Sequence, residues 1–105
     1  MNIQKAIANR KRRRIIERLN TYEAAKNGLS TKELTIGMGV SRQAITKHLD
    51  LLARFGFVEA SFVGKEEKHY LNQPIFIAAT QGIEPALVEW DQKLRNLKRQ
   101  LRNRE

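Results

Sequence analysis

Residues 30–56 are STKELTIGMGVSRQAITKHLDLLARFG, a stretch with two helix starts on either side of a glycine-containing turn. Ser30 and Glu33 form the pattern of a capping box, in which each side chain binds the other residue's backbone N–H group. Ser41 follows an apolar residue and is a second N-cap. Two short capped helices with a glycine turn between them predict a helix-turn-helix over residues 30–55.

The second of these helices is expected to run from Arg42 to Phe55, where Gly56 ends it. Helical periodicity places one set of its residues inward: Ala44, Ile45, His48, Leu49 and Leu52. The opposite set faces outward: Arg42, Gln43, Thr46, Lys47 and Asp50. Arginine and lysine pair with guanine, glutamine pairs with adenine, and threonine suits a phosphate or a thymine methyl group. Asp50 fits a DNA groove less well because its carboxylate repels phosphate.

The other elements follow from apolar spacing and turn residues. They are one long helix over residues 1–28, with a break near Asn20-Thr21 left open, a β-hairpin over residues 57–72, and a helix over residues 84–103. In the hairpin, strands 57–63 and 68–72 flank the loop Gly64-Lys65-Glu66-Glu67. The conformation of residues 74–82 is undecided between strand and helix. The predicted fold is mainly α with a small β-hairpin wing (α+β), in a single domain over residues 1–105.

Composition limits the classes of function. Lys and Arg number 20 against 11 Asp and Glu, and the net charge of +9 favours partners that carry phosphate. Cysteine is absent, which excludes disulfides, thiolate metal sites and cysteine nucleophiles. No apolar run approaches the length of a signal core or of a membrane span, so we expect a soluble, intracellular protein without a membrane partner.

Two further patterns are open to more than one interpretation. Residues 10–14 are RKRRR, which is either a solvated helix face or a surface for phosphate contact, nuclear targeting or RNA binding, with Arg12 and Arg13 as candidate DNA contacts. Apolar residues at steps of three and four mark a heptad seam on the C-terminal helix, which packs within one subunit or pairs two subunits. The candidate dimerisation residues are Ile7, Leu87, Trp90, Leu94, Leu97 and Leu101.

Residues 30–72 resemble the ArsR-type winged helix-turn-helix signature. The matching residues are SRQAITKHL at 41–49, then Leu52, Phe55-Gly56-Phe57-Val58, Gly64 and Tyr70-Leu71-Asn72. The resemblance implies a homodimer whose recognition helices enter major grooves and whose wings reach the backbone or minor groove. It also implies repression with release of DNA when a ligand binds. The apolar seam makes the C-terminal helix the candidate dimerisation helix. The matched positions assign DNA contact to Ser41, Arg42, Gln43, Thr46 and Lys47, with Lys65 and Lys68 on the wing. His48 would fix the helix or touch phosphate.

The metal sites of related sensors are not expected in this chain. Those sensors use cysteine pairs near the second helix, or Asp, His and Glu on the C-terminal helix, and here no histidine follows His69. His48 and His69 alone do not make a metal site, so both are expected to be structural. Ser30 and Ser41 are explained by capping, and no general base, oxyanion site or phosphate loop accompanies them. We expect no enzyme activity, no metal and no cofactor, while the effector ligand is unknown.

The leading hypothesis is therefore a sequence-specific regulator of transcription that binds double-stranded DNA as a homodimeric repressor, in the cytoplasm and associated with the nucleoid. The alternative is a non-specific architectural or chromatin-like DNA-binding protein, which the net charge and the arginine run would suit. A third class is a winged module for RNA or protein contact. The operator and the source of the chain cannot be read from the sequence.

Overall fold

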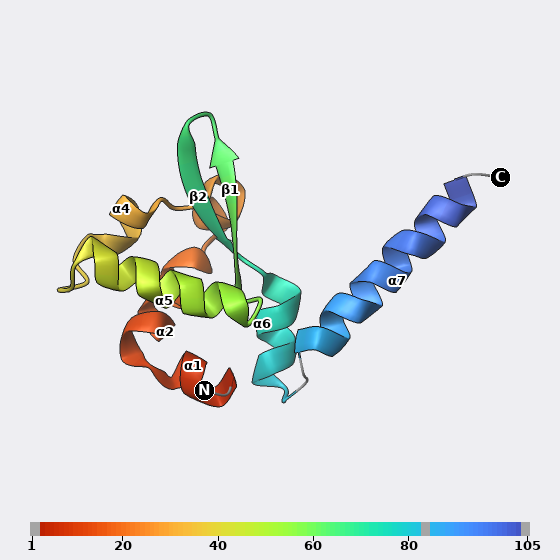
Figure 1. The fold of residues 1–105 in the computed structure, drawn as a ribbon, viewed down its shortest axis with the longest axis horizontal. Coiled ribbons are helices and arrows are strands. Elements are labelled where there is room, and N and C mark those ends of the chain that lie inside the picture. The colour runs from red at the N-terminus through yellow and green to blue at the C-terminus, as the bar shows by residue number, and fades with distance from the viewer. Residues whose placement is uncertain (1–2, 83–84, 104–105) are drawn as a thin grey trace. The chain divides into compact units, whose positions relative to one another are not determined.

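A computed structural model of the protein describes residues 3–82 and 85–103 (Figure 1). The helices are α1 (Ile3–Ala8), α2 (Arg10–Leu19), α3 (Tyr22–Asn27), α4 (Thr31–Thr35), α5 (Arg42–Arg54), α6 (Gln73–Thr80) and α7 (Pro85–Asn103), and the strands are β1 (Val58–Val63) and β2 (Glu66–Leu71). This composition confirms the predicted fold class of a mainly helical winged helix-turn-helix with a hairpin and a C-terminal helix. The chain divides into two compact units, residues 1–72 and 73–105, which are described separately. A single domain over 1–105 stays a prediction.

The N-terminal segment is a correction to the sequence-based prediction, because it forms α1, α2 and α3 rather than one long helix. The unexpected break is at Asn9, whose backbone is extended and whose Oδ1 accepts the N–H groups of Lys11 and Arg12 at 3.0 and 3.1 Å. The break left open near Asn20-Thr21 is present, and Thr21 caps α3. Both breaks have the same cause: a polar side chain binds backbone N–H groups that a continuous helix would use.

The helix-turn-helix begins as the sequence predicts. Ser30 Oγ accepts the N–H of Glu33 at 3.1 Å, and the Glu33 carboxylate accepts the N–H of Ser30 at 3.0 Å, which completes the capping box of α4. Ser41 Oγ accepts the N–H of Ala44 at 3.1 Å and caps α5. Met38 lies buried in the turn between the two helices. The turn therefore contributes a residue to the hydrophobic core.

The hairpin pairs β1 with β2 in antiparallel register from Val58–Leu71 to Val63–Glu66. The loop is the two residues Gly64-Lys65, and not the predicted four, since Glu66 and Glu67 belong to β2. Gly64 has φ +66°, whereas Lys65 does not have a positive φ, because every described residue with a positive φ is a glycine. This pattern fits a type II′ turn, which has glycine in its first central position. On its other edge β2 forms a bridge at His69 with Leu29, the residue between α3 and α4.

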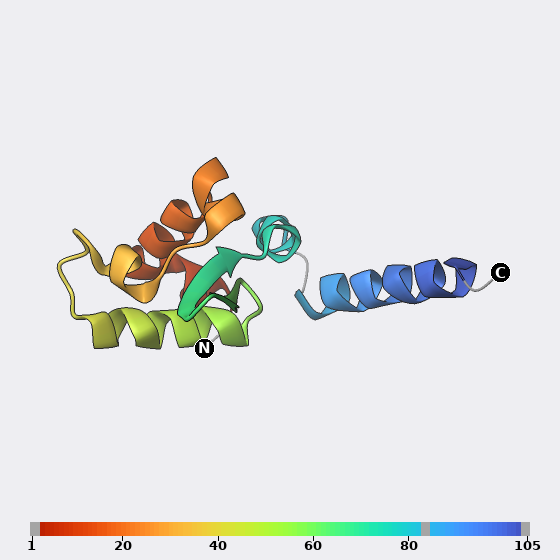
Figure 2. The same cartoon turned by 90° about the horizontal axis from the view of Figure 1, so that it is seen from above.

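The core of residues 3–72 lies between the helices and the base of the hairpin. Its fully or nearly fully buried apolar side chains are Ala6, Ile15, Ile16, Leu19, Ala24, Leu34, Met38, Ile45, Leu49, Leu52, Phe57 and Val58. Figure 2 shows α5, in yellow-green, along one edge of this unit, with α2 to α4 on one side of it. The other side of α5 faces away from the core.

Gly28 is a position where only glycine fits. Its φ is +68°, and a Cβ there would lie 2.7 Å from Cζ of Tyr70 and 2.8 Å from Cβ of Lys68. Gly28→Ala is expected to lower the free energy of unfolding by about 1–3 kcal/mol, because a strained backbone and a steric clash combine. Gly64→Ala is the control, since it has a similar φ of +66° but no atom within 4 Å. Urea denaturation should show a larger loss at Gly28, and equal losses would mean that the clash with Tyr70 has no effect.

The second unit consists of α6 and α7. Residues 74–82, undecided from sequence, are helical up to Thr80, and the chain then turns at Gln81-Gly82. Ile75, Ala78 and Ala79 of α6 are buried. Pro85 is the first residue of α7, where its missing N–H has no helical partner to lose.

Candidate nucleic-acid interface

Helix α5 carries the outward polar face that the sequence predicts. Ile45, Leu49 and Leu52 are buried and anchor one side of the helix, while Ala44 and His48 at the edge of that side are half-buried. Ser41 and the outward residues are exposed: Arg42, Gln43, Thr46, Lys47 and Asp50. The helix is thus held on one side and presents cations and amides on the other, which is the arrangement that a recognition helix requires.

Four of these side chains lie together on the surface. Arg42, Gln43, Thr46 and Lys47 line one open hollow over the first two turns of α5. Thr46 Oγ1 donates to the carbonyl of Arg42 at 3.1 Å, so its methyl group and oxygen lone pairs remain for outside contacts. Donors for base acceptors and a methyl for a thymine methyl therefore lie side by side.

Asp50, the outward residue that suits DNA least, interacts electrostatically with His69 of β2: burial lowers the pKa of that histidine, and the charge of Asp50 opposes this shift. It lies two turns beyond Arg42 along α5. Its electrostatic interaction with the hairpin gives it a role apart from base contact.

Two cations of α2 bind backbone carbonyls of the helix-turn-helix. Lys11 Nζ donates to the carbonyl of Met38 in the turn, and Arg18 Nη1 donates to the carbonyl of Leu34 at 3.0 Å, at the C-terminal end of α4. These carbonyls lie where backbone acceptors lack helical partners, and a cation is favoured there. Sequence reasoning missed both residues, because their partners are backbone atoms of residues at least 16 positions away.

Arg12 differs most from its expected place. It was a candidate DNA contact, but its side chain is only 7% exposed and its Nε donates to the carbonyl of Ala6 at 2.6 Å. Its Nη1 lies 3.2 Å from Nδ1 of His48. Arg12 shares the apolar stripe of Ile15, Ile16 and Leu19, and that spacing was the signal in the sequence that could have placed it inside. We therefore assign Arg12 to support of α5 and not to phosphate contact.

The rest of the basic run points outward. Arg10 and Arg13 are exposed and Arg14 is half-buried. Because Lys11 and Arg12 bind the protein itself, the run offers fewer cations to a duplex than its sequence suggests. Arg13 keeps the exposure that a phosphate contact needs.

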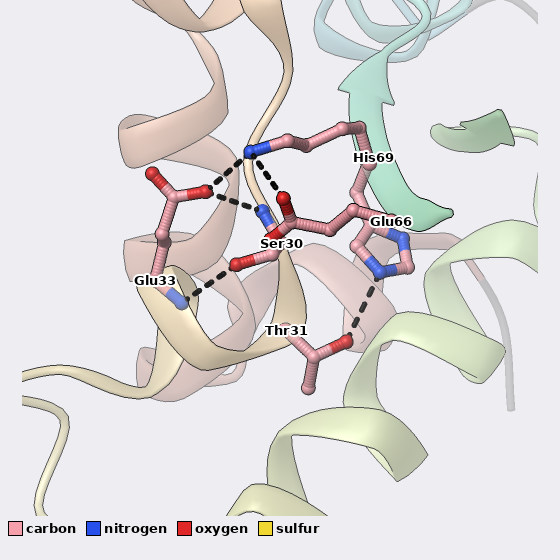
Figure 3. Close-up of polar contacts among 6 residues, drawn as sticks. Ser30, Thr31, Glu33, Glu66 and His69 are labelled. Carbon is pink, nitrogen blue, oxygen red and sulfur yellow. Dashed lines mark hydrogen bonds and ion pairs between the residues drawn. The ribbon is translucent and has the colours of Figure 1, made fainter. Parts of the chain in front are cut away.

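The wing is less basic than expected. Lys65 is exposed in the hairpin loop, but Lys68 Nζ lies 2.8 Å from Glu33 Oε1 and 3.7 Å from Glu66 Oε2, with 17% of its side chain exposed (Figure 3). The hairpin also carries the carboxylates of Glu59, Glu66 and Glu67. Lys68 therefore joins β2 to the capping box of α4, and Lys65 is the wing cation available to phosphate.

His69 is a structural residue, placed beside Lys68 on β2. Its ring is buried, and Nε2 lies 3.1 Å from Oγ1 of Thr31 (Figure 3). Nε2 also lies 3.6 Å from Oε1 of Glu67. Its backbone N–H and carbonyl bind Leu29 at 2.8 and 3.0 Å. Side chain and backbone together fix the hairpin against the helix-turn-helix.

Acid is expected to destabilise the protein in two steps. Burial lowers the pKa of His48, helped by the charge of Arg12, and burial lowers the pKa of His69 against the opposing charges of Glu67 and Asp50. The folded state then binds fewer protons than the unfolded chain. The stabilisation that the two neutral histidines contribute is therefore complete above pH 6.5 and decreases as the pH falls below it.

The second step belongs to Glu33. The hydrogen bond from Lys68, then the N–H of Ser30, lowers its pKa from 4.5 to about 2, so its stabilisation is lost as the pH falls through that interval. Urea midpoints measured across this pH range should show both decreases. Lys68→Gln should remove most of the lower one, and a lower step unchanged in that variant would contradict the assignment to the Lys68–Glu33 pair.

The candidate dimerisation residues fall on both units. Ile7 of α1 is half-buried. On α7, Leu94, Leu97 and Leu101 are 38%, 53% and 57% exposed, high values for leucine. Leu87 and Trp90 belong to α7, but their side chains lie outside the described residues. The described part of α7 therefore has an apolar row that its own unit leaves in contact with solvent.

The described residues form neither of two other kinds of site. Within residues 3–82 and 85–103, no three side chains of the metal-binding types His, Asp and Glu converge. None of the helices in the same ranges combines the length and apolarity that a membrane crossing requires.

Comparison with known proteins agrees with this geometry. A family model described as "Helix-turn-helix domain" matches residues 7–60. An ArsR-like transcriptional regulator from Rhodococcus sp. RHA1 is 29% identical with a TM-score of 0.63, over 92% of this chain and 87% of that one. Rv0081 of M. tuberculosis is 24% identical with a TM-score of 0.58, over 96% and 87%, a likeness that bears on the fold alone. A comparison of the sequence with curated proteins found no match.

Proposed function

Because this chain belongs to the helix-turn-helix domain family, and within it to the ArsR-type winged transcriptional regulators, we propose that it is a homodimeric repressor of a specific DNA sequence. As a DNA-binding regulator of transcription it belongs to a class of proteins without enzyme activity. One observation supports sequence-specific binding above all: the four polar side chains that line the hollow on α5 are exposed while the opposite side of the helix is buried.

Base readout is assigned to Arg42, Gln43 and Lys47. In the major groove, arginine or lysine donates to O6 and N7 of guanine, and glutamine exchanges two hydrogen bonds with adenine. Thr46 offers its methyl group to thymine. Ser41 Oγ accepts the N–H of Ala44, which leaves its hydroxyl hydrogen to donate to a phosphate at the N-terminus of α5. These residues occupy the first two turns of α5, the part of a recognition helix that enters the groove first.

Backbone contact is assigned to Lys65 at the wing tip and Arg13 on α2, both exposed cations. Each phosphate they neutralise adds about 0.9 to the slope of log affinity against log salt concentration. Lys68 is not among them, since its ammonium group is bound to Glu33.

Dimerisation is assigned to the leucine row of α7, with Ile7 as a further contact. An exposed apolar row on a helix is stabilised when a second copy covers it. A two-fold dimer offers two recognition helices to half-sites about 34 Å apart, one turn of DNA. We place the dimer in the cytoplasm with the nucleoid, where a repressor meets its operator. The effector that would release it is not assigned.

A competition experiment distinguishes sequence-specific repression from non-specific, architectural binding. One labelled promoter duplex bound by the protein is challenged with unlabelled copies of itself and with a scrambled duplex, at one salt concentration. The proposal predicts that the scrambled duplex competes at least about 1,000-fold more weakly. Equal competition would support the architectural class, and competition by structured RNA alone would support the third. A reporter gene behind the same promoter should lose expression when the protein is present.

A further inference from the structure

Arg12 connects the three helices α1, α2 and α5. From α2 its guanidinium donates through Nε to the carbonyl of Ala6 at 2.6 Å and through Nη2 to the carbonyl of Lys5 at 3.4 Å, both in α1. Through Nη1 it reaches Nδ1 of His48 in α5 at 3.2 Å. The two bonds to α1 orient the guanidinium, so the position of Nη1 relative to α5 is determined by the rest of the fold.

The contact with Arg12 determines where the proton of His48 sits. A guanidinium has only donors and stays protonated, so Nδ1 of His48 must be the acceptor and carries no hydrogen. The ring hydrogen of neutral His48 is then on Nε2. If both ring nitrogens of His48 were protonated, its Nδ1–H group would face an N–H group of Arg12, and two cations would lie in contact.

Nε2 of His48 keeps contact with solvent. No buried polar side-chain atom in the described ranges lacks a hydrogen-bond partner, and Nε2 has no partner within them, so solvent reaches this nitrogen. His48 lies at the edge of the buried face of α5, directly after the exposed Lys47. An acceptor approaching the recognition helix can therefore meet the Nε2–H group.

We infer that Arg12 is a positioning residue for DNA binding, which fixes His48 as an uncharged Nε2–H donor to a backbone phosphate beside α5. This inference rests on the proposed function and adds a chemical distinction to it. A charged histidine would release a counterion on binding and raise the salt slope, whereas a neutral donor contributes affinity without changing that slope.

The first test is made on the full-length protein without DNA. Nitrogen-15 NMR of the imidazoles at neutral pH should show His48 with a bare Nδ1 and a protonated Nε2. Arg12→Gln should change that distribution toward a mixture of tautomers. A protonated Nδ1 in the unmodified protein, or a distribution that Arg12→Gln leaves unchanged, would overturn the inference whatever the protein does with DNA.

The second test measures duplex affinity against salt concentration for His48→Asn. An asparagine Oδ1 replaces Nδ1 as acceptor for Arg12, but nothing replaces the Nε2–H group. Affinity should fall about tenfold, as for one hydrogen bond to a charged acceptor, with the salt slope unchanged. Arg13→Gln, one residue from Arg12 but exposed, is the contrast and should lower the slope by about 0.9. A slope that falls equally in His48→Asn would show a cationic histidine.

A double-mutant cycle completes the test, because Arg12→Gln alone could weaken binding by loosening α1. If Arg12 acts through His48, Arg12→Gln should cost much less affinity in a His48→Asn protein than in the unmodified one. Losses that simply multiply would refute the positioning role. If the unmodified protein binds no duplex, the proposed function fails together with the phosphate contact, while the NMR result still decides the Arg12–His48 link.

Discussion

Replacing Arg42 with alanine is expected to reduce the preference for a cognate over a scrambled duplex by about 10- to 100-fold, and Gln43→Ala should act similarly. Each side chain is exposed on the face of α5 that turns away from the core, so its loss leaves the fold intact. A bidentate pair with a base accounts for about 1–3 kcal/mol of discrimination, which corresponds to that range. The two variants should relax preference at different positions of the site.

The measurement is a pair of binding curves, cognate and scrambled, at one salt concentration. Lys32→Ala is the matched control, because Lys32 is also exposed and cationic but lies on α4, outside the proposed interface. It should leave the cognate-to-scrambled ratio unchanged. Arg42→Ala and Gln43→Ala proteins that keep the original ratio would place base readout elsewhere.

Leu94→Glu is expected to give a monomer that binds the operator about 100- to 10,000-fold more weakly. Leu94 is the middle residue of the heptad seam, and the new carboxylate would need to be buried between two α7 helices without a partner. A monomer also loses the gain from two linked half-sites, which is commonly in this range.

Sedimentation analysis and a duplex titration check the two parts of this prediction. Lys93→Glu places the same carboxylate one residue earlier, outside the apolar positions of the seam, and should remain dimeric. A Leu94→Glu protein that still sediments as a dimer would exclude α7 from the interface and leave Ile7 of α1 as the remaining candidate contact.

Local chemistry explains which parts of the fold could be predicted from sequence. The starts of α4 and α5 depend on Ser30, Glu33 and Ser41, whose hydrogen bonds reach no further than three residues. The hairpin depends on Gly64 and the β-branched and aromatic residues around it. The outward face of α5 follows from helical periodicity with three anchoring apolar residues. Each of these features is encoded within a short stretch of chain.

Features that depend on distant partners could not be predicted from the sequence. Arg12 and Lys68 were counted as cations for DNA, but a carbonyl of α1 and a carboxylate of α4 bind them within the protein. The sequence does not show whether a charged side chain pairs with a phosphate or with another group of the same chain. The break at Asn9 is different, because an asparagine N-cap is a local signal, and it was outweighed by the apolar spacing on both sides.

We propose that the exposed face of α5 reads bases in a DNA duplex as part of a two-fold dimer. Selection of bound sequences from a random duplex pool tests it most directly, with Gln43→Ala selected in parallel. We expect an enriched palindrome with half-site centres about one DNA turn apart, and a loss of base preference at matching positions in both half-sites for Gln43→Ala. A pool that shows no enriched sequence, or the same sequence for both proteins, would contradict it.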